Sequence, residues 1–338
     1  SPNDDVNMSQ SSNDVIPTAI KLSAYMDLTK KLFPALDGLI KSINDKADSL
    51  KGTIKTGRTH LMDAMPIDFS EELKAWSSQL ESSKEMLNVI EKKFLELSQG
   101  GTAVGSGINA HKQFAKLFAQ EITKLTKNKY KFTPAKNFYH ELSAQDCSVQ
   151  LSGELKNLAV ILMKISNDLR WMNSGPLAGI SEIELKALQP GSSIMPGKVN
   201  PVIPEAVAMA SADVIGNDVS ITVAAQSGNF QLNVMLPVIA YNLLKSINLL
   251  SGSMNALSKN AIKTFKVNHK NLETSLSKNP ILVTALNPLV GYEKAASIAK
   301  KAYKENRPII DVAAEETDLA KSELIKLLNP SKLAKGGL

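Results

Sequence analysis

One stretch of the sequence gathers side chains that are suited to gripping a carboxylate. Residues 191–201 read GSSIMPGKVNP, and two glycines and two prolines within this segment predict a loop. The loop offers hydroxyl, ammonium and amide groups from Ser192, Ser193, Lys198 and Asn200. Hydroxyls and amides donate hydrogen bonds to a carboxylate, an ammonium group neutralises its charge, and a spare hydroxyl can act as a base. A purely structural interpretation stays open at this point, with the serines capping a helix and Lys198 in solvent.

Two more loops, at residues 9–13 and 100–109, are rich in glycine, serine, threonine and asparagine and interrupt the helical pattern. Loops at helix ends can present backbone N–H groups to an anion. We therefore treat these two loops, together with residues 190–201, as candidate anion-binding segments.

Long helices must position these loops. Apolar residues recur at steps of four and three from Phe69 to Leu97, with Ser83 as the one polar break. This heptad seam predicts a helix about 45 Å long, which needs other long helices beside it. Further helices are expected over residues 143–172, 205–225 and 232–257. The last two carry few charges and should be buried on nearly all faces, so we predict an all-α bundle that continues into other subunits.

The sequence changes character from about Lys266. Shorter helices are expected there, because prolines interrupt the chain at Pro280, Pro288, Pro308 and Pro330. We predict a small helical C-terminal domain over residues 266–338.

Composition excludes several classes of protein. The net charge of +6 comes from 39 basic and 33 acidic residues that are interspersed, and only 5% of residues are aromatic, so no nucleic-acid partner is expected. No run of about 18 apolar residues occurs, so we expect no membrane contact. Cys147 is the only cysteine, which rules out a disulfide within the chain and favours a buried, inert thiol in a reducing, cytoplasmic setting.

Residues 191–201 closely resemble the signature of the fumarase/aspartase superfamily, whose members add or eliminate a group across the bond next to a carboxylate. Other segments are also similar to blocks shared by fumarases, in the family's order, at residues 7–14, 57–60, 100–105, 228–234 and 284–288. The resemblance implies a long-helix bundle that forms a tetrameric core of twenty helices. It also implies a homotetramer in which each active site draws on three chains.

Two positions favour fumarases within this superfamily. His60 follows Thr59 where aspartases usually have glutamine, and Gly197 stands where aspartases typically have alanine. Residues 202–205 (VIPE) are the one segment that is more like aspartases. The expected activity is the reversible hydration of fumarate to malate, a step of the tricarboxylic acid cycle, with a small dicarboxylate as the partner. An aspartate ammonia-lyase and a non-catalytic structural homologue remain as alternatives.

The resemblance also implies roles for individual residues. Ser192 corresponds to the serine that takes the proton beside the substrate carboxylate, which leaves an aci-carboxylate to be stabilised. His60, a residue type that exchanges protons near neutral pH, acts at the water side of the substrate together with Glu205. The implied substrate-binding residues are Ser11, Ser12, Asn13, Thr59, Ser193, Lys198, Val199 and Asn200. No metal and no organic cofactor is implied.

The chain begins at Ser1 inside a block of the family, so we expect further residues upstream. Residues 1–12 are then the remnant of an N-terminal domain, and residues 13–265 form the central bundle domain. Ser1, Pro2, Asn3 and Asp4 match a second anion site of the family. We expect the 338-residue chain alone to form the tetramer but to turn substrate over weakly. A mitochondrial location stays open beside a cytoplasmic one.

Overall fold

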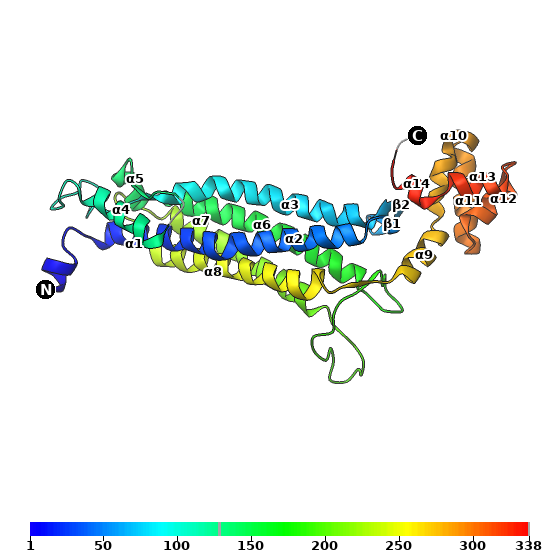
Figure 1. The fold of residues 1–338 in the computed structure, drawn as a ribbon, viewed down its shortest axis with the longest axis horizontal. Coiled ribbons are helices and arrows are strands. Elements are labelled where there is room, and N and C mark those ends of the chain that lie inside the picture. Colours follow the sequence, from blue (N-terminus) through cyan, green and yellow to red (C-terminus); the bar gives the residue numbers. More distant parts are fainter. Residues whose placement is uncertain (128–129, 337–338) are drawn as a thin grey trace. The chain divides into compact units, whose positions relative to one another are not determined.

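The computed structural model describes residues 1–127 and 130–336. Helices account for most of these residues, and the few strands are short, which confirms the predicted all-α class (Figure 1). The chain divides into two units. Unit 1 consists of Ser1–Ile40, Gln79–Asn167 and Val202–Lys259, and unit 2 consists of Lys41–Ser78, Asp168–Pro201 and Asn260–Leu338. The predicted domain boundaries at residues 12 and 265 stay a prediction.

Unit 1 is built from long helices. After a short helical turn, η1 (Pro2–Val6), it contains these elements: α1 (Ser12–Asp27), η2 (Leu28–Leu32), η3 (Lys92–Leu95), α4 (Phe114–Thr126), α5 (Phe138–Ser143), α7 (Val202–Ala225) and α8 (Leu236–Leu257). Three more helices have residues in both units: α2 (Phe33–Ser49), α3 (Phe69–Glu91) and α6 (Asp146–Met172).

The predicted heptad seam is confirmed as a buried stripe. Its apolar residues from Phe69 to Leu97 are all less than a tenth exposed, and the polar break, Ser83, is buried with them. The helix itself is shorter than predicted. It ends at Glu91, a 3-10 turn follows, and Glu96 and Leu97 form strand β3, which pairs with β4 (Thr133–Pro134). Phe94 and Leu97 continue the buried stripe at helical steps of four and three, so the pattern could not show where the backbone changed.

Helix α7 corrects the prediction that its segment would be buried nearly all round. It packs along α8, yet the opposite face exposes Met209, Val219 and Val223, which are 67%, 61% and 49% accessible. An isolated chain leaves this apolar face uncovered. By length and composition alone α7 could cross a membrane, but the core helix of a bundle passes the same test, so the observation is weak.

Unit 2 holds two elements that a helical pattern does not show. Strands β1 (Ile54–Thr59) and β2 (Met62–Asp68) form an antiparallel hairpin, and β5 (Ile183–Glu184) pairs with β6 (Lys266–Val267). Strands β5 and β6 have two residues each, and the burial of β1 and β2 does not alternate, so neither pair has the period of two that marks a strand in sequence.

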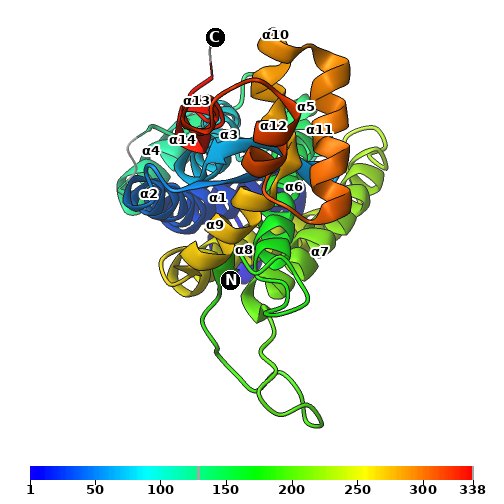
Figure 2. The same ribbon diagram turned by 90° about the vertical axis from the view of Figure 1, so that its right-hand side faces the viewer.

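The last part of unit 2 is a cluster of short helices (Figure 2). They are α9 (His269–Lys278), η5 (Pro280–Leu286), α10 (Asn287–Val290), α11 (Tyr292–Glu305), α12 (Ile309–Glu316), α13 (Lys321–Leu327) and α14 (Pro330–Leu333). The four prolines expected to punctuate this region all lie at helix starts, where proline costs no hydrogen bond. The helices share one apolar core around Leu286, Ile298, Val312 and Leu324.

Candidate active site

The segment between Asn173 and Val202 carries the loop that the sequence singled out, and the prediction of a loop is correct (green, Figure 2). The loop closes on itself. The Gly191 N–H donates to the Lys198 carbonyl at 3.0 Å, and the Asn200 side-chain amide donates to the Gly191 carbonyl at 2.9 Å. Gly191 is required at this position, because a Cβ there would lie 2.4 Å from the Lys198 oxygen. Ser192 therefore lies at the neck of the loop, by which we mean residues 191 and 198–200, where the two ends of the loop are hydrogen-bonded to each other.

The hydroxyl of Ser192 lies at the focus of backbone donors. The N–H groups of Ile194 and Met195 donate to its Oγ at 3.2 and 3.0 Å. Donors aimed at a hydroxyl oxygen stabilise it when it carries negative charge, so this arrangement suits a serine that acts as a base. Ser192 is half-buried, whereas Ser193 and Val199 are exposed.

The ammonium group of Lys198 is turned toward Asn200. Its Nζ donates to Asn200 Oδ1 at 2.8 Å, and Lys198 itself is exposed. The pair leaves two ammonium hydrogens and the open side of the loop available to an anion. Lys198 and Asn200 are thus brought together as the sequence predicted, at the same neck as Ser192.

His60 lies at the tip of the β1–β2 hairpin. His60 and Leu61 form a two-residue turn and both adopt left-handed backbone angles, with φ of 54° and 61°. Residues other than glycine rarely adopt this conformation, and such strain concentrates at functional sites. His60 and the preceding Thr59 are exposed. The hairpin thus presents both predicted site residues at one turn.

A buried ionic network supports the base of this hairpin. Lys55 is 2% exposed, and its Nζ lies 2.6 Å from Glu182 Oε2 and 2.8 Å from Glu72 Oε2. Arg58 Nη1 donates to the other oxygen of Glu182 at 2.5 Å. The Lys55–Glu182 contact lacks the angles of a hydrogen bond and acts as an ion pair. Sequence reasoning missed Glu182, since only a tertiary contact relates it to residue 58.

Helix α1 begins at the predicted carboxylate-binding serines. Ser11 is the N-cap, and its Oγ accepts a hydrogen bond from the Asn13 N–H at 3.2 Å. Ser12 is exposed, with its hydroxyl at 3.5 Å from Asn13 Oδ1. The Asn13 amide donates to the Ala103 carbonyl at 2.8 Å, which joins the helix start to the 100–109 loop. Ser11 therefore has a structural role in addition to its predicted one.

Glu205 lies in the first turn of α7 and is half-buried. Within unit 1 it is far from Ser11–Asn13, because α7 ends, rather than begins, near the start of α1. Gly228, just after α7, approaches the carbonyl of Ser143 so closely that a Cβ would lie 3.0 Å from it. Ser143 is the last residue of α5, and Glu141 of the same helix pairs with Lys21 of α1. The end of α7 therefore lies near α1. Twenty residues of helix separate Glu205 from the end of α7, which is about 30 Å.

The predicted second anion site is a short exposed turn in unit 1. Pro2 begins η1, and the Ser1 hydroxyl accepts from the Asp4 N–H at 3.3 Å. Asn3 is exposed.

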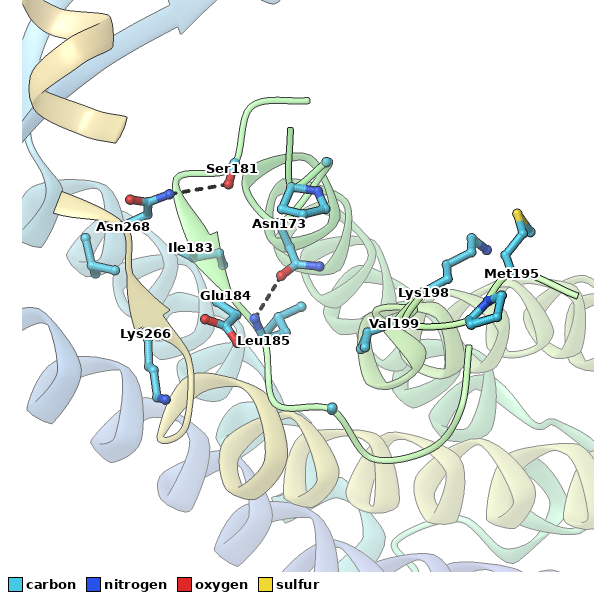
Figure 3. A pocket seen from close by; sticks show the side chains of 16 residues that line it. Asn173, Ser181, Ile183, Glu184, Leu185, Met195, Lys198, Val199, Lys266 and Asn268 are labelled. Carbon is cyan, nitrogen blue, oxygen red and sulfur yellow. Dashed lines mark hydrogen bonds between the residues drawn. The ribbon is translucent and has the colours of Figure 1, made fainter. Parts of the chain in front are cut away.

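A cavity of about 950 Å³ lies beside the Ser192 loop in unit 2 (Figure 3). One wall is formed by Met195, Lys198 and Val199, and the other carries Glu184 and Lys266 on β5 and β6. Ser192 and His60 do not line it. Lys198 and Val199 are thus the predicted site residues that line this cavity.

The remaining histidines and the cysteine lie outside the loops described above. Among the described residues no group of three or more histidine, cysteine or acidic side chains could hold a metal ion. His140 forms a hydrogen bond with Asp146. Cys147, predicted to be buried, is only partly buried, and this burial raises the pKa of its thiol.

Known proteins resemble this chain along its whole length. The lyase family matches residues 1–216, and the fumarase C C-terminus matches residues 282–335. A class II fumarate hydratase of Pseudomonas aeruginosa is 57% identical over 100% of this chain and 73% of its own length. One of Bacillus subtilis is 45% identical over 99% of this chain and 72% of its own length.

The fold is shared as well. The crystal structure of a class II fumarase from Schistosoma mansoni superposes with a TM-score of 0.94 at 35% identity, covering 99% of this chain and 72% of that one. The helical fold, the match to the lyase family and the match to the fumarase C C-terminus together identify the chain as a lyase. The chain belongs to the class II fumarate hydratase family.

Proposed function

We propose that this chain catalyses the reversible hydration of fumarate to malate, with Ser192 as the base that takes the proton from the carbon next to a carboxylate. The observation that carries the proposal is the pair of backbone N–H groups aimed at Ser192 Oγ. That proton is only weakly acidic. A serine can remove it only if its alkoxide form is stabilised, and two preorganised donors supply part of that stabilisation.

Loss of the proton places negative charge on the neighbouring carboxylate. Lys198 and Asn200, joined at 2.8 Å, are proposed to hold this aci-carboxylate, because they offer an ammonium charge and an amide donor on one rigid neck. Ser193, Val199 and Thr59 complete the proposed substrate contacts on the same loop and on the hairpin. Ser11, Ser12 and Asn13 are proposed to bind the substrate carboxylate at the start of α1, where the helix dipole favours an anion.

At the water side of the substrate, His60 is proposed to exchange the proton of water or hydroxide, with Glu205 fixing its tautomer. The strained turn at His60, with φ of 54°, supports this role, since strain is retained where function requires it.

The site is proposed to be shared between subunits of a homotetramer. Within unit 1 the helix start at Ser11–Asn13 and Glu205 lie at opposite ends of α7, about 30 Å apart, so one copy of unit 1 cannot bring both to one substrate. Helices of unit 1 also expose large apolar side chains. These are Val160 on α6, Met209, Val219 and Val223 on α7, and Val238 and Tyr241 on α8. An uncovered apolar face of this kind marks a protein interface.

Ser1, Pro2, Asn3 and Asp4 are proposed as part of a second anion site, on the strength of their match to the family block.

The test is to follow fumarate absorbance in the ultraviolet after adding malate or aspartate, without added metal. Fumarate formed from malate supports the proposal. Fumarate formed from aspartate but not from malate would establish the alternative activity, that of an aspartate ammonia-lyase. Residues 202–205 are the segment that resembles such enzymes. No turnover of either compound would favour the structural homologue.

A further inference from the structure

Asp14 is a fully buried carboxylate for which the chemistry above has no use. It is 0% exposed. Its Oδ1 accepts the Ser11 N–H at 3.0 Å, which completes the capping box of α1. Its Oδ2 accepts the N–H groups of Gly100 and Thr102 at 3.0 and 2.9 Å, and the Gln99 amide at 3.3 Å. One carboxylate therefore joins the start of α1 to a loop more than eighty residues away.

The loop is shaped to deliver these donors. Gly100 has φ of 107° and Thr102 has φ of 57°, so the backbone doubles back and turns two N–H groups toward one point. No side chain fits on the inner side of the turn, because a Cβ on Gly100 would lie 2.5 Å from the Ala115 Cβ. The expectation that this loop presents N–H groups to an anion is thus met by the protein's own Asp14.

Asp14 also determines where its neighbours point. Asn13 precedes it directly, and the Asn13 amide donates to the Ala103 carbonyl of the loop that Asp14 holds. Ser12 remains exposed on the outer side of the same turn. Two hydrogen bonds thus fix residues 11–13: the Ser11 N–H donates to Asp14, and the Asn13 side-chain amide donates to the carbonyl of Ala103 in the loop.

We propose that Asp14 is a positioning residue, which holds Ser12 and Asn13 in register with the 100–103 loop so that they can bind a substrate carboxylate. The inference rests on the proposed function, which assigns that carboxylate to residues 11–13. Asp14 itself touches no substrate. Because Ser12 and Asn13 would bind the carboxylate before and during the reaction alike, a loss of their register raises KM more than it lowers kcat.

The first variant is Asp14→Asn in the assembled enzyme. The amide keeps the volume but offers one acceptor oxygen, and its NH2 group would face either the Ser11 N–H or the loop N–H groups. We expect KM for malate and fumarate to rise by about tenfold or more while kcat changes by less than about threefold. The matched control is Asp218→Asn, since Asp218 is an equally buried carboxylate of unit 1, bonded to Ser152 and Lys156. The KM of Asp218→Asn should stay within about twofold of wild type, because Asp218 shares no hydrogen-bond partner with residues 11–13 and distant sites act independently. An unchanged KM in a folded Asp14→Asn enzyme overturns the proposal.

A milder variant covers the case in which Asp14→Asn does not fold. Gln99→Met removes one donor with a side chain of similar volume, so we expect a KM increase of a few-fold, about what one weak hydrogen bond contributes. A wild-type KM in this variant, when Asp14→Asn does not fold, also counts against the proposal.

Amide hydrogen exchange separates this inference from the proposed reaction, because it needs no turnover. Segments 11–13 and 99–103 should exchange faster in Asp14→Asn, or in Gln99→Met, than in wild type and in Asp218→Asn. Inactivity of the wild type towards malate would sink the proposed function alone. Unchanged exchange in both segments would sink the positioning role, whatever the activity.

Discussion

Arg58 and Glu182 form an ion pair, with 2.5 Å between Nη1 and Oε1, directly beside the Thr59–His60 end of strand β1. The same carboxylate also pairs with the buried ammonium of Lys55. Glu182, the residue directly before β5, thus pairs with both cations of β1, Lys55 and Arg58. The hairpin that presents His60 is therefore held by an interaction more than a hundred residues away in sequence.

Glu182→Ala should lower the free energy of unfolding by about 2 kcal/mol, because Arg58 loses this carboxylate and the buried Lys55 keeps only Glu72 from its pair of carboxylates. Urea denaturation followed by circular dichroism measures the change. Glu71→Ala is the control, since its pair with Lys74 is exposed and should contribute little to the free energy of unfolding. Equal effects of the two substitutions would contradict the importance of the buried network.

His140 should make unit 1 more stable in acid than in base. Its hydrogen bond to Asp146, with Glu141 also nearby, raises the pKa of His140 above its ordinary value of 6.5. A raised folded-state pKa gives stability that is complete below pH 6.5 and is lost as pH rises through the folded value. The pair is half-exposed, so the contribution is below about 1 kcal/mol. Asp146→Asn should lower the melting temperature at pH 6 and leave it nearly unchanged at pH 9; equal losses at both would refute this.

Much of the fold follows from sequence because its signals are local. The heptad seam from Phe69 to Leu97, the proline-punctuated tail and the loop around Ser192 each depend on the spacing of nearby residues, and each has its expected burial or conformation. Helix α7 was expected to be buried all round because its composition is apolar, but composition does not say whether a face is covered by the same chain or by another.

The supporting residues of the site could not be predicted in the same way. Asp14 and Glu182 act through contacts 85 or more residues away, with Gln99 and Arg58 as partners. The residues next to Asp14 and Glu182 in the sequence do not show whether each carboxylate is buried and joins two segments or lies on the surface. The hairpin at His60 was missed because its turn lacks the glycine or asparagine that usually marks one.

The assembled protein should be a tetramer in solution, because the exposed apolar residues of α7 need a partner surface. Light scattering at micromolar concentration measures the mass. A mass equal to that of one chain would contradict both the interface and the shared site.

Substitution of His60 should slow the reaction without disturbing the fold. His60→Asn removes a general acid–base group, so turnover should fall by roughly 10²–10⁴-fold. Leu61→Ala, at the other position of the same turn, is the matched control and should stay near wild type. Mixing His60→Asn with Ser192→Ala subunits should give more activity than either alone, because a shared site can then receive both native residues. No gain on mixing would place the two residues in one chain's site.

The most direct test of the account is the turnover of Ser192→Ala, followed as fumarate absorbance with malate as substrate. The substitution removes the hydroxyl that accepts the N–H groups of Ile194 and Met195, and with it the proposed base. We predict a folded protein with the wild-type mass and helical content whose kcat is lower by about three orders of magnitude or more. A Ser192→Ala enzyme that forms fumarate from malate at close to the wild-type rate would contradict the assignment of Ser192 as the base.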